Sequence, residues 1–214
     1  MLTKKFLDGT ITFTELISEE FKNEIRTLQA KMENGKEQVV QAVKKVMKFV
    51  SKLSTGKQTI NLVEFYKTGN KKQPLWLGDN FQQILKEATS DSETVEIDET
   101  FYQHQNTETV TDNDAMAELK ETQIDLGTAE GRLEARKRLG AMAHFLKQQP
   151  KAEKGELLTN GYANVIGWFK TKSGSVFDGG CDWFADYQEW YCFSYDLSGW
   201  SADQRFWSRN GEAQ

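Results

Sequence analysis

The tryptophans of this chain are concentrated near its C-terminus, and this distribution constrains the fold more than any other feature. Five of the six tryptophans lie between Trp168 and Trp207. The short polar breaks TKSGS, ADYQ and SGWSAD interrupt this region at hairpin distances. Aromatic residues favour strands and regularly spaced turn signals favour hairpins, so residues 159–214 are predicted to form an antiparallel β-meander of about four strands.

The two cysteines set the register of one predicted hairpin. Cys181 and Cys192 begin and end the stretch CDWFADYQEWYC. A loop of DY or of ADYQ pairs Trp183 with Trp190 and Cys181 with Cys192, because both loops have an even number of residues. The strands before and after the Ser173–Gly174 turn are expected to add three residues to this apolar core face: Ile166, Trp168 and Phe177.

Reduced, structural thiols are expected at Cys181 and Cys192. Buried cysteines behave as small hydrophobic residues unless a base or a metal lowers the pKa of the thiol. The hairpin contains no histidine or third cysteine that would complete a four-ligand zinc site. A cross-strand disulfide and a redox or metal site are the alternatives, and we expect no metal and no cofactor.

The opposite face of the same strands is the candidate binding surface. It is predicted to carry Phe169, Asp178, Asp182, Tyr191, Phe193 and Tyr195. One interpretation is that the aromatic rings cover the glycines Gly167 and Gly180, predicted to face each other, and that this face packs on a helix from the N-terminal half. The other is an open aromatic platform with two carboxylates, suited to a cation, a basic peptide or a sugar.

The first 148 residues are predicted to mix helices and strands. Two long amphipathic helical stretches are expected, one from Ser18 to Leu53 with a break at Asn34–Gly35, and one from Thr128 to Lys147. Shorter elements follow from local pattern: strands at 58–66, around Trp76 and at 94–103, a helix with Asp79 as N-cap, and a loop at 102–127 with a short helix. The predicted fold class is α+β, with a mixed region at 1–148, a linker at 149–158 and the sheet at 159–214.

Charge is unevenly distributed along the chain. The segment from Asp91 to Asp125 contains eleven acids and one base, whereas the chain as a whole has a net charge of −5. Five acids define a candidate acidic surface for a basic protein partner: Glu96, Asp98, Asp112, Asp114 and Glu118. A basic cluster in the helix predicted at 128–147 is the intramolecular alternative partner: Arg132, Arg136, Lys137 and Arg138.

No catalytic motif of high specificity is present. His104 and His144 are forty residues apart, and neither has a glutamate or cysteine at metal-ligand spacing. No apolar run approaches about 18 residues, so a cytoplasmic protein without a membrane segment is expected. We predict a non-catalytic protein-interaction or accessory protein that engages a basic partner through residues 91–125. A ligand-binding module using the aromatic face is the alternative, and nucleic-acid binding by the helix at 128–147 is disfavoured.

Overall fold

The computed structural model describes residues 47–67, 75–197 and 199–210, and the predictions made for residues before 47 lie outside this part of the chain. The described residues belong to one compact unit. Its centre is an eight-stranded mixed sheet in the order β1-β5-β12-β8-β9-β10-β3, with β7 paired to β8 off this path. The strands of this sheet are β1 (Met47–Ser54), β3 (Leu75–Leu77), β5 (Thr100–Asn106), β7 (Ile124–Asp125), β8 (Asn164–Lys170), β9 (Val176–Phe184), β10 (Glu189–Phe193) and β12 (Arg205–Ser208).

The predicted fold class is therefore wrong, because the sheet is larger than a C-terminal meander. β8, β9 and β10 do form consecutive antiparallel pairs. However, β12 pairs in parallel with β8 and antiparallel with β5, and β10 pairs in parallel with β3. Strands from both sides of residues 149–158 thus enter one sheet. Such pairings join segments far apart in sequence, and local turn signals carry no information about them.

Two small two-stranded sheets accompany the large one. One pairs β2 with β4 and the other pairs β6 with β11. Their bounds are β2 (Gln58–Asn61), β4 (Thr94–Ile97), β6 (Val110–Thr111) and β11 (Gly199–Trp200). The strand expected at 58–66 ends early, because the Asn61 side chain accepts a hydrogen bond from the Glu64 amide and caps a helical turn.

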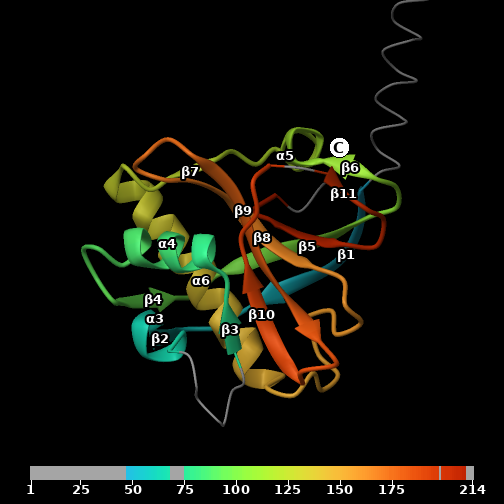
Figure 1. Cartoon of the computed structure of the whole chain (residues 1–214), viewed down its shortest axis with the longest axis horizontal. Coiled ribbons are helices and arrows are strands. Elements are labelled where there is room, and N and C mark those ends of the chain that lie inside the picture. Colours follow the sequence, from blue (N-terminus) through green and yellow to red (C-terminus); the bar gives the residue numbers. More distant parts are fainter. Residues whose placement is uncertain (1–46, 68–74, 198, 211–214) are drawn as a thin grey trace, which may run out of the picture. The chain divides into compact units, whose positions relative to one another are not determined.

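Four helices are described, and they lie in two groups. Their bounds are α3 (Leu62–Phe65), α4 (Asp79–Ala88), α5 (Asp112–Leu119) and α6 (Ala129–Gln148). α6 is the amphipathic helix expected from Thr128, whose hydroxyl accepts from the Gly131 amide as an N-cap. In Figure 1, α4 and α6 lie together, and α5 lies apart from them near β6 and β11. α4 begins after Gly78 without a side-chain cap, so the predicted capping role of Asp79 is wrong.

β1 is a strand where the sequence predicts the end of a helix. Met47 and Leu53 are its two buried residues, and they belong to different core clusters. The pairing of β1 with β5 shifts register between Phe49 and Ser51. A bulge of this kind turns the following residues to the other face, so apolar residues at helix-like spacing are compatible with a strand.

β5 extends the strand predicted at 94–103 into residues 104–106, where the sequence predicts a loop. Its polar residues Gln103 and Asn106 are buried in the sheet, and their side chains are hydrogen-bonded. The side-chain amide of Gln103 donates to the Glu156 carbonyl, and the Asn106 side chain accepts from the Gln204 amide and donates to the Ser201 carbonyl. Buried polar groups are tolerated when they have such partners.

The two faces of the sheet are covered differently. α4 and α6 pack on one face, where the core includes Leu139, Phe145, Trp190 and Trp207. The other face carries a smaller cluster that includes Trp168, Phe193 and Phe206 together with apolar residues of α5. Of the described residues, none form a helix that is both long enough and apolar enough to cross a bilayer.

Candidate functional site

The cysteine hairpin has the predicted register. Trp183 pairs with Trp190 and Cys181 pairs with Cys192, across a loop of residues 185–188. Both cysteines are free and fully buried. Burial raises the pKa of the Cys181 and Cys192 thiols well above the usual range, since a thiolate is poorly stabilised in an apolar setting. The two thiols therefore serve as packed core side chains, and they lie on the core face that α6 covers.

A bulge in β8 exchanges the predicted faces of Trp168 and Phe169. The register shifts between Val165 and Gly167, so that Trp168 pairs with Asp178 and Phe169 pairs with Phe177. Phe169 is buried in the core on the α6 side and does not belong to the candidate aromatic face. Trp168 takes its place on that face. Gly167 consequently lies opposite Gly179, and the predicted opposition of Gly167 and Gly180 is wrong.

Helix α6 contacts β8 at this bulge. The guanidinium of Arg138 donates from Nη1 to the carbonyl of Ile166 at 2.7 Å. This carbonyl lies at the point where the β8–β9 ladder is interrupted. A buried carbonyl that loses its ladder partner needs another donor, and Arg138 supplies it.

The remaining predicted residues of the aromatic face differ in accessibility. Asp178 and Phe193 are buried, Asp182 and Tyr191 are half-buried, and Tyr195 is exposed. Phe193 stacks on Tyr195 with ring centroids 5.1 Å apart. The Phe193 ring also lies over Gly180, as the interpretation of rings covering glycines predicts.

Part of this face is covered and part is open. α5 covers the end that carries Trp168 and Phe206, and the carboxylate of Asp112 accepts hydrogen bonds from the indoles of Trp168 and Trp200 at 2.6 and 2.9 Å. At the other end lies a group of rings that we call the aromatic shelf. Its members are Trp76, Phe184, Tyr187 and Tyr191.

The aromatic shelf is held together by strand pairing and ring contacts. Tyr191 of β10 pairs directly with Trp76 of the parallel strand β3, and their rings stack at 4.4 Å between centroids. Phe184 contacts Tyr191 at 5.6 Å and Tyr187 at 6.3 Å between ring centroids. The side chains of Trp76 and Tyr187 are nevertheless 52% and 74% exposed. The rings are thus ordered by neighbours but not covered by them.

A pocket of about 310 Å³ opens at the shelf. Trp76, Phe184, Tyr187 and Glu189 line it. A larger hollow of about 660 Å³ lies over α3 and α4, and its lining includes the long, flexible side chains of Lys67, Gln82, Gln83 and Lys86. Tyr66, the aromatic residue in that lining, is buried and donates to the Leu139 carbonyl.

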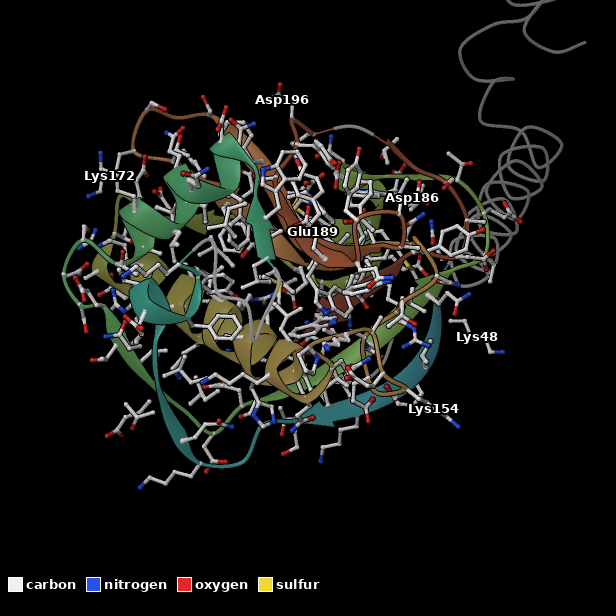
Figure 2. All side chains as sticks on the ribbon, turned by 60° about the horizontal axis from the view of Figure 1, so that its bottom comes forward. Lys48, Lys154, Lys172, Asp186, Glu189 and Asp196 are labelled. Carbon is white, nitrogen blue, oxygen red and sulfur yellow. The ribbon has the colours of Figure 1, made fainter. Side chains whose placement is uncertain are left out.

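The β9–β10 part of the shelf comes from a stretch of sequence without lysine or arginine. Residues 173–204 contain six acids and no lysine or arginine. Figure 2 shows Asp186 and Glu189 at the β9–β10 hairpin, with Lys48 and Lys154 well away from both. Asp182 pairs with Tyr191, and burial raises the pKa of its carboxyl to about 6. One of the Asp182 carboxyl oxygens is buried without a hydrogen-bond partner.

The five residues of the candidate acidic surface do not share one environment. Glu96, Asp98 and Asp114 are exposed, whereas Asp112 and Glu118 are buried. Glu118 accepts from the Met47 amide, and burial raises the pKa of its carboxyl to about 7. The predicted surface is thus reduced to three accessible acids on two separate parts of the chain.

Three of the eleven acids in the acidic segment pair with helix α6. Asp91 pairs with Arg132 and Arg136, Glu99 with Lys137, and Glu121 with Arg138. Arg136 and Arg138 are themselves buried. Their guanidinium groups are therefore committed to partners within the chain and are not presented to a phosphate backbone.

The two histidines also make contacts within the fold. His104 is buried in β5, and burial lowers the pKa of its imidazole. His144 of α6 contacts the side-chain amides of Gln58 and Gln148. Neither histidine lies at the shelf. The described part of the chain contains no cluster of three or more side chains suited to a metal ion.

Four residues of the open site were missed by sequence reasoning: Trp76, Phe184, Tyr187 and Glu189. Trp76 joins the site through the parallel pairing of β3 with β10, which no local pattern predicts. The absence of lysine and arginine from residues 173–204 was the available signal, and it points to the same hairpin.

Comparisons with known proteins add no functional information, because no family model, curated protein or solved structure matches this chain.

Proposed function

We propose that this chain is a non-catalytic binding protein that holds its ligand on the aromatic shelf. The observation that carries the proposal is the pocket lined by Trp76, Phe184, Tyr187 and Glu189. Its rings are fixed in place yet open to solvent, as a preformed binding site requires. Of the two interpretations of the aromatic face, the open platform describes this end of the sheet.

The energetic argument concerns the cost of exposed rings. Each large aromatic ring left in water forgoes hydrophobic stabilisation of roughly 1.5–3 kcal/mol relative to full burial. Single exposed apolar residues are common on protein surfaces, but adjacent ones usually mark an interaction site. Trp76, Phe184 and Tyr187 are three adjacent exposed rings. A ligand that covers them recovers part of that stabilisation.

The chemistry of the shelf favours binding over catalysis. Its residues provide ring faces, hydroxyl groups and the carboxylate of Glu189. The thiols of Cys181 and Cys192 are on the opposite, covered face. The partner is therefore proposed to engage the shelf, where exposed rings and a carboxylate line one pocket.

The test is a fragment titration followed by backbone amide NMR. The probes are phenol, methyl glucoside and tetramethylammonium, each titrated separately against the full chain. Shift changes should concentrate on β3, β10 and the loop at 185–188 for at least one probe. A Trp76→Ala plus Tyr187→Ala variant should lose them.

The matched control is Phe49→Ala. Phe49 is also an exposed ring, with 48% of its surface accessible, but it lies on β1. This variant should bind as the unmodified protein does. Shift changes that cluster instead around the hollow over α3 and α4, or no shift with any probe, would contradict the proposal.

A further inference from the structure

We propose that the ligand of the shelf is a basic peptide segment of a partner protein, with one arginine or lysine side chain inserted beside Glu189. This inference rests on the proposed function and names the chemistry of its ligand. Three features of the site carry it: the charge around the shelf, the orientation of its rings, and the size of the pocket.

The charge argument is local. Glu189 lines the pocket, and the exposed Asp186 lies three residues earlier in the loop of the same hairpin. No lysine or arginine occurs in residues 173–204, so no base of the hairpin itself competes for these carboxylates. In the segment from Asp91 to Asp125, by contrast, three acids are paired with α6. Asp186 and Glu189 are therefore available to a partner.

Asp182 adds a second, partly buried carboxyl next to the shelf. It lies directly across from Tyr191, and one of its oxygens is buried without a partner. A cation close to Asp182 would stabilise its charged form and so bind more tightly as that carboxyl ionises. A neutral sugar would gain nothing from this ionisation.

The rings supply the second contribution. A guanidinium or ammonium group is attracted to the face of an aromatic ring, and tryptophan gives the largest effect. Trp76 and Tyr187 both line the pocket with much of their surface exposed. A guanidinium can stack on a ring and at the same time donate to a carboxylate, because its donors lie in the plane of the group.

The pocket size favours a single side chain. Its volume of about 310 Å³ is at the lower end of the usual range of roughly 300–1,000 Å³ for ligand pockets. The shelf continues beyond the pocket through Tyr191, which lies between Trp76 and Phe184. One inserted side chain therefore fills the pocket, while the rest of an extended peptide lies across the neighbouring rings. A free small cation would leave those rings uncovered.

The experiment compares two peptides that differ in one charge. Acetyl-Gly-Gly-Arg-Tyr-Gly-amide and the same peptide with citrulline in place of arginine are titrated against the full chain by calorimetry and amide NMR. Citrulline keeps the shape of arginine but lacks its charge. We expect the arginine peptide to bind at least about tenfold more tightly, since roughly 1.4 kcal/mol corresponds to that ratio.

Variants localise the effect to the hairpin. Glu189→Gln should weaken binding of the arginine peptide by about three- to tenfold and leave the citrulline peptide unchanged. Glu96→Gln is the matched control, because Glu96 is an exposed acid on β4, outside the site. It should change neither affinity. Raising the salt concentration to about 0.5 M should reduce the preference for arginine, because the screening length falls below about 5 Å.

The possible outcomes distinguish a failure of the basic-peptide proposal from a failure of the shelf as a binding site. Equal binding of both peptides on the shelf overturns the cationic ligand and leaves the shelf as a binding site. If acetyl-arginine-amide binds as tightly as the peptide, the proposal that the ligand is a peptide segment is wrong. Equal loss in Glu189→Gln and Glu96→Gln overturns the localised contact. If neither peptide nor any of the three fragments shifts the shelf amides, both proposals fail.

Discussion

Asp178 is the residue with the most unusual surroundings. Its side chain is fully buried, one carboxyl oxygen accepts from the Tyr195 amide, and the other has no hydrogen-bond partner. The pKa of this carboxyl is raised from the ordinary 3.8 to about 8, mainly by burial and in smaller part by the nearby acids Asp112 and Asp196, against the lowering effect of the Tyr195 amide. At neutral pH the folded protein therefore carries Asp178 mainly in its neutral form.

This pKa predicts how stability depends on pH. The folded state binds the proton more tightly than the unfolded state, so stabilisation is complete below pH 3.8 and is lost as pH rises towards about 8. One such group reduces the free energy of unfolding by up to about 1.4 kcal/mol per pH unit in that window. Asp178→Asn should remove this contribution. In urea unfolding at pH 5, 6.5 and 8, the variant should gain stability relative to the unmodified protein as pH rises.

Glu118 and Asp182 also have raised pKa values, of about 7 and about 6, and both remain in the variant. Some decline in stability with pH should therefore persist in Asp178→Asn. Parallel stability curves for the two proteins would show that Asp178 is already ionised in the folded state at pH 5.

At the scale of single elements, the β9 glycines explain how the aromatic face is built. A Cβ atom on Gly180 would collide with the carbonyl oxygen of Asn164 on β8 and would lie 2.8 Å from Cζ of Phe193. The missing side chain thus lets β8 approach and lets the Phe193 ring lie flat over β9. Gly180 is needed for close approach and not for an unusual backbone conformation.

Gly180→Ala should destabilise the protein by about 1–3 kcal/mol, the usual cost of overpacking a close-packed site. Thermal unfolding followed by tryptophan fluorescence would measure the loss. Gly199→Ala is the control, because a Cβ there meets only the Val110 carbonyl oxygen at an ordinary 3.6 Å. A loss below about 0.5 kcal/mol in Gly180→Ala would mean that β8 and Phe193 can move aside.

Individual elements were predictable from sequence where their signals are local. The cysteine hairpin was predicted correctly because loop length alone fixes which residues face each other. The faces of Trp168 and Phe169 were not, because no local pattern marks the bulge that precedes them; the donor to its Ile166 carbonyl is Arg138, 28 residues away in sequence. β1 was predicted as helix for a related reason, since its bulge places Met47 and Leu53 on opposite faces.

At the scale of the whole molecule, the limits of prediction follow from sequence distance. The hairpin β9–β10 is predictable from its own sequence, but its parallel neighbour β3 begins more than a hundred residues earlier. The aromatic shelf depends on that pairing, because it brings Trp76 beside Tyr191. Sequence reasoning therefore identified Tyr191 as a candidate residue but not the pocket it helps to frame.

Arg138 is the residue that links these distant parts. Its guanidinium pairs with Glu121 at 2.6 Å and with Glu134 at 2.8 Å, and it donates to the Ile166 carbonyl at the β8 bulge. The side chain is only 2% exposed. One buried cation thus connects α6, the segment after α5 and the central sheet.

Arg138→Met should be strongly destabilising. Methionine fills much of the volume but leaves Glu121 buried without its cationic partner and the Ile166 carbonyl without its donor. Removing one partner of a buried ion pair typically costs 3–5 kcal/mol, because the remaining charge is uncompensated. Urea unfolding followed by both circular dichroism and tryptophan fluorescence should show one coincident transition at lower urea. The near-ultraviolet spectrum should change, since the bulge positions Trp168.

Arg132→Met is the matched control on the same helix. Arg132 also pairs with an acid, Asp91, but that carboxylate is 40% exposed to solvent. Exposed ion pairs contribute about 0.2–1 kcal/mol, because water screens the charges and already solvates them. Both variants remove one positive charge from α6, so a difference in their stability cannot come from the net charge of the helix. A large loss of stability in Arg138→Met alone would identify the buried guanidinium as the connection between helix and sheet. Equal losses in the two variants would show that the contacts of Arg138 with Glu121 and Ile166 contribute no more to stability than an exposed ion pair does.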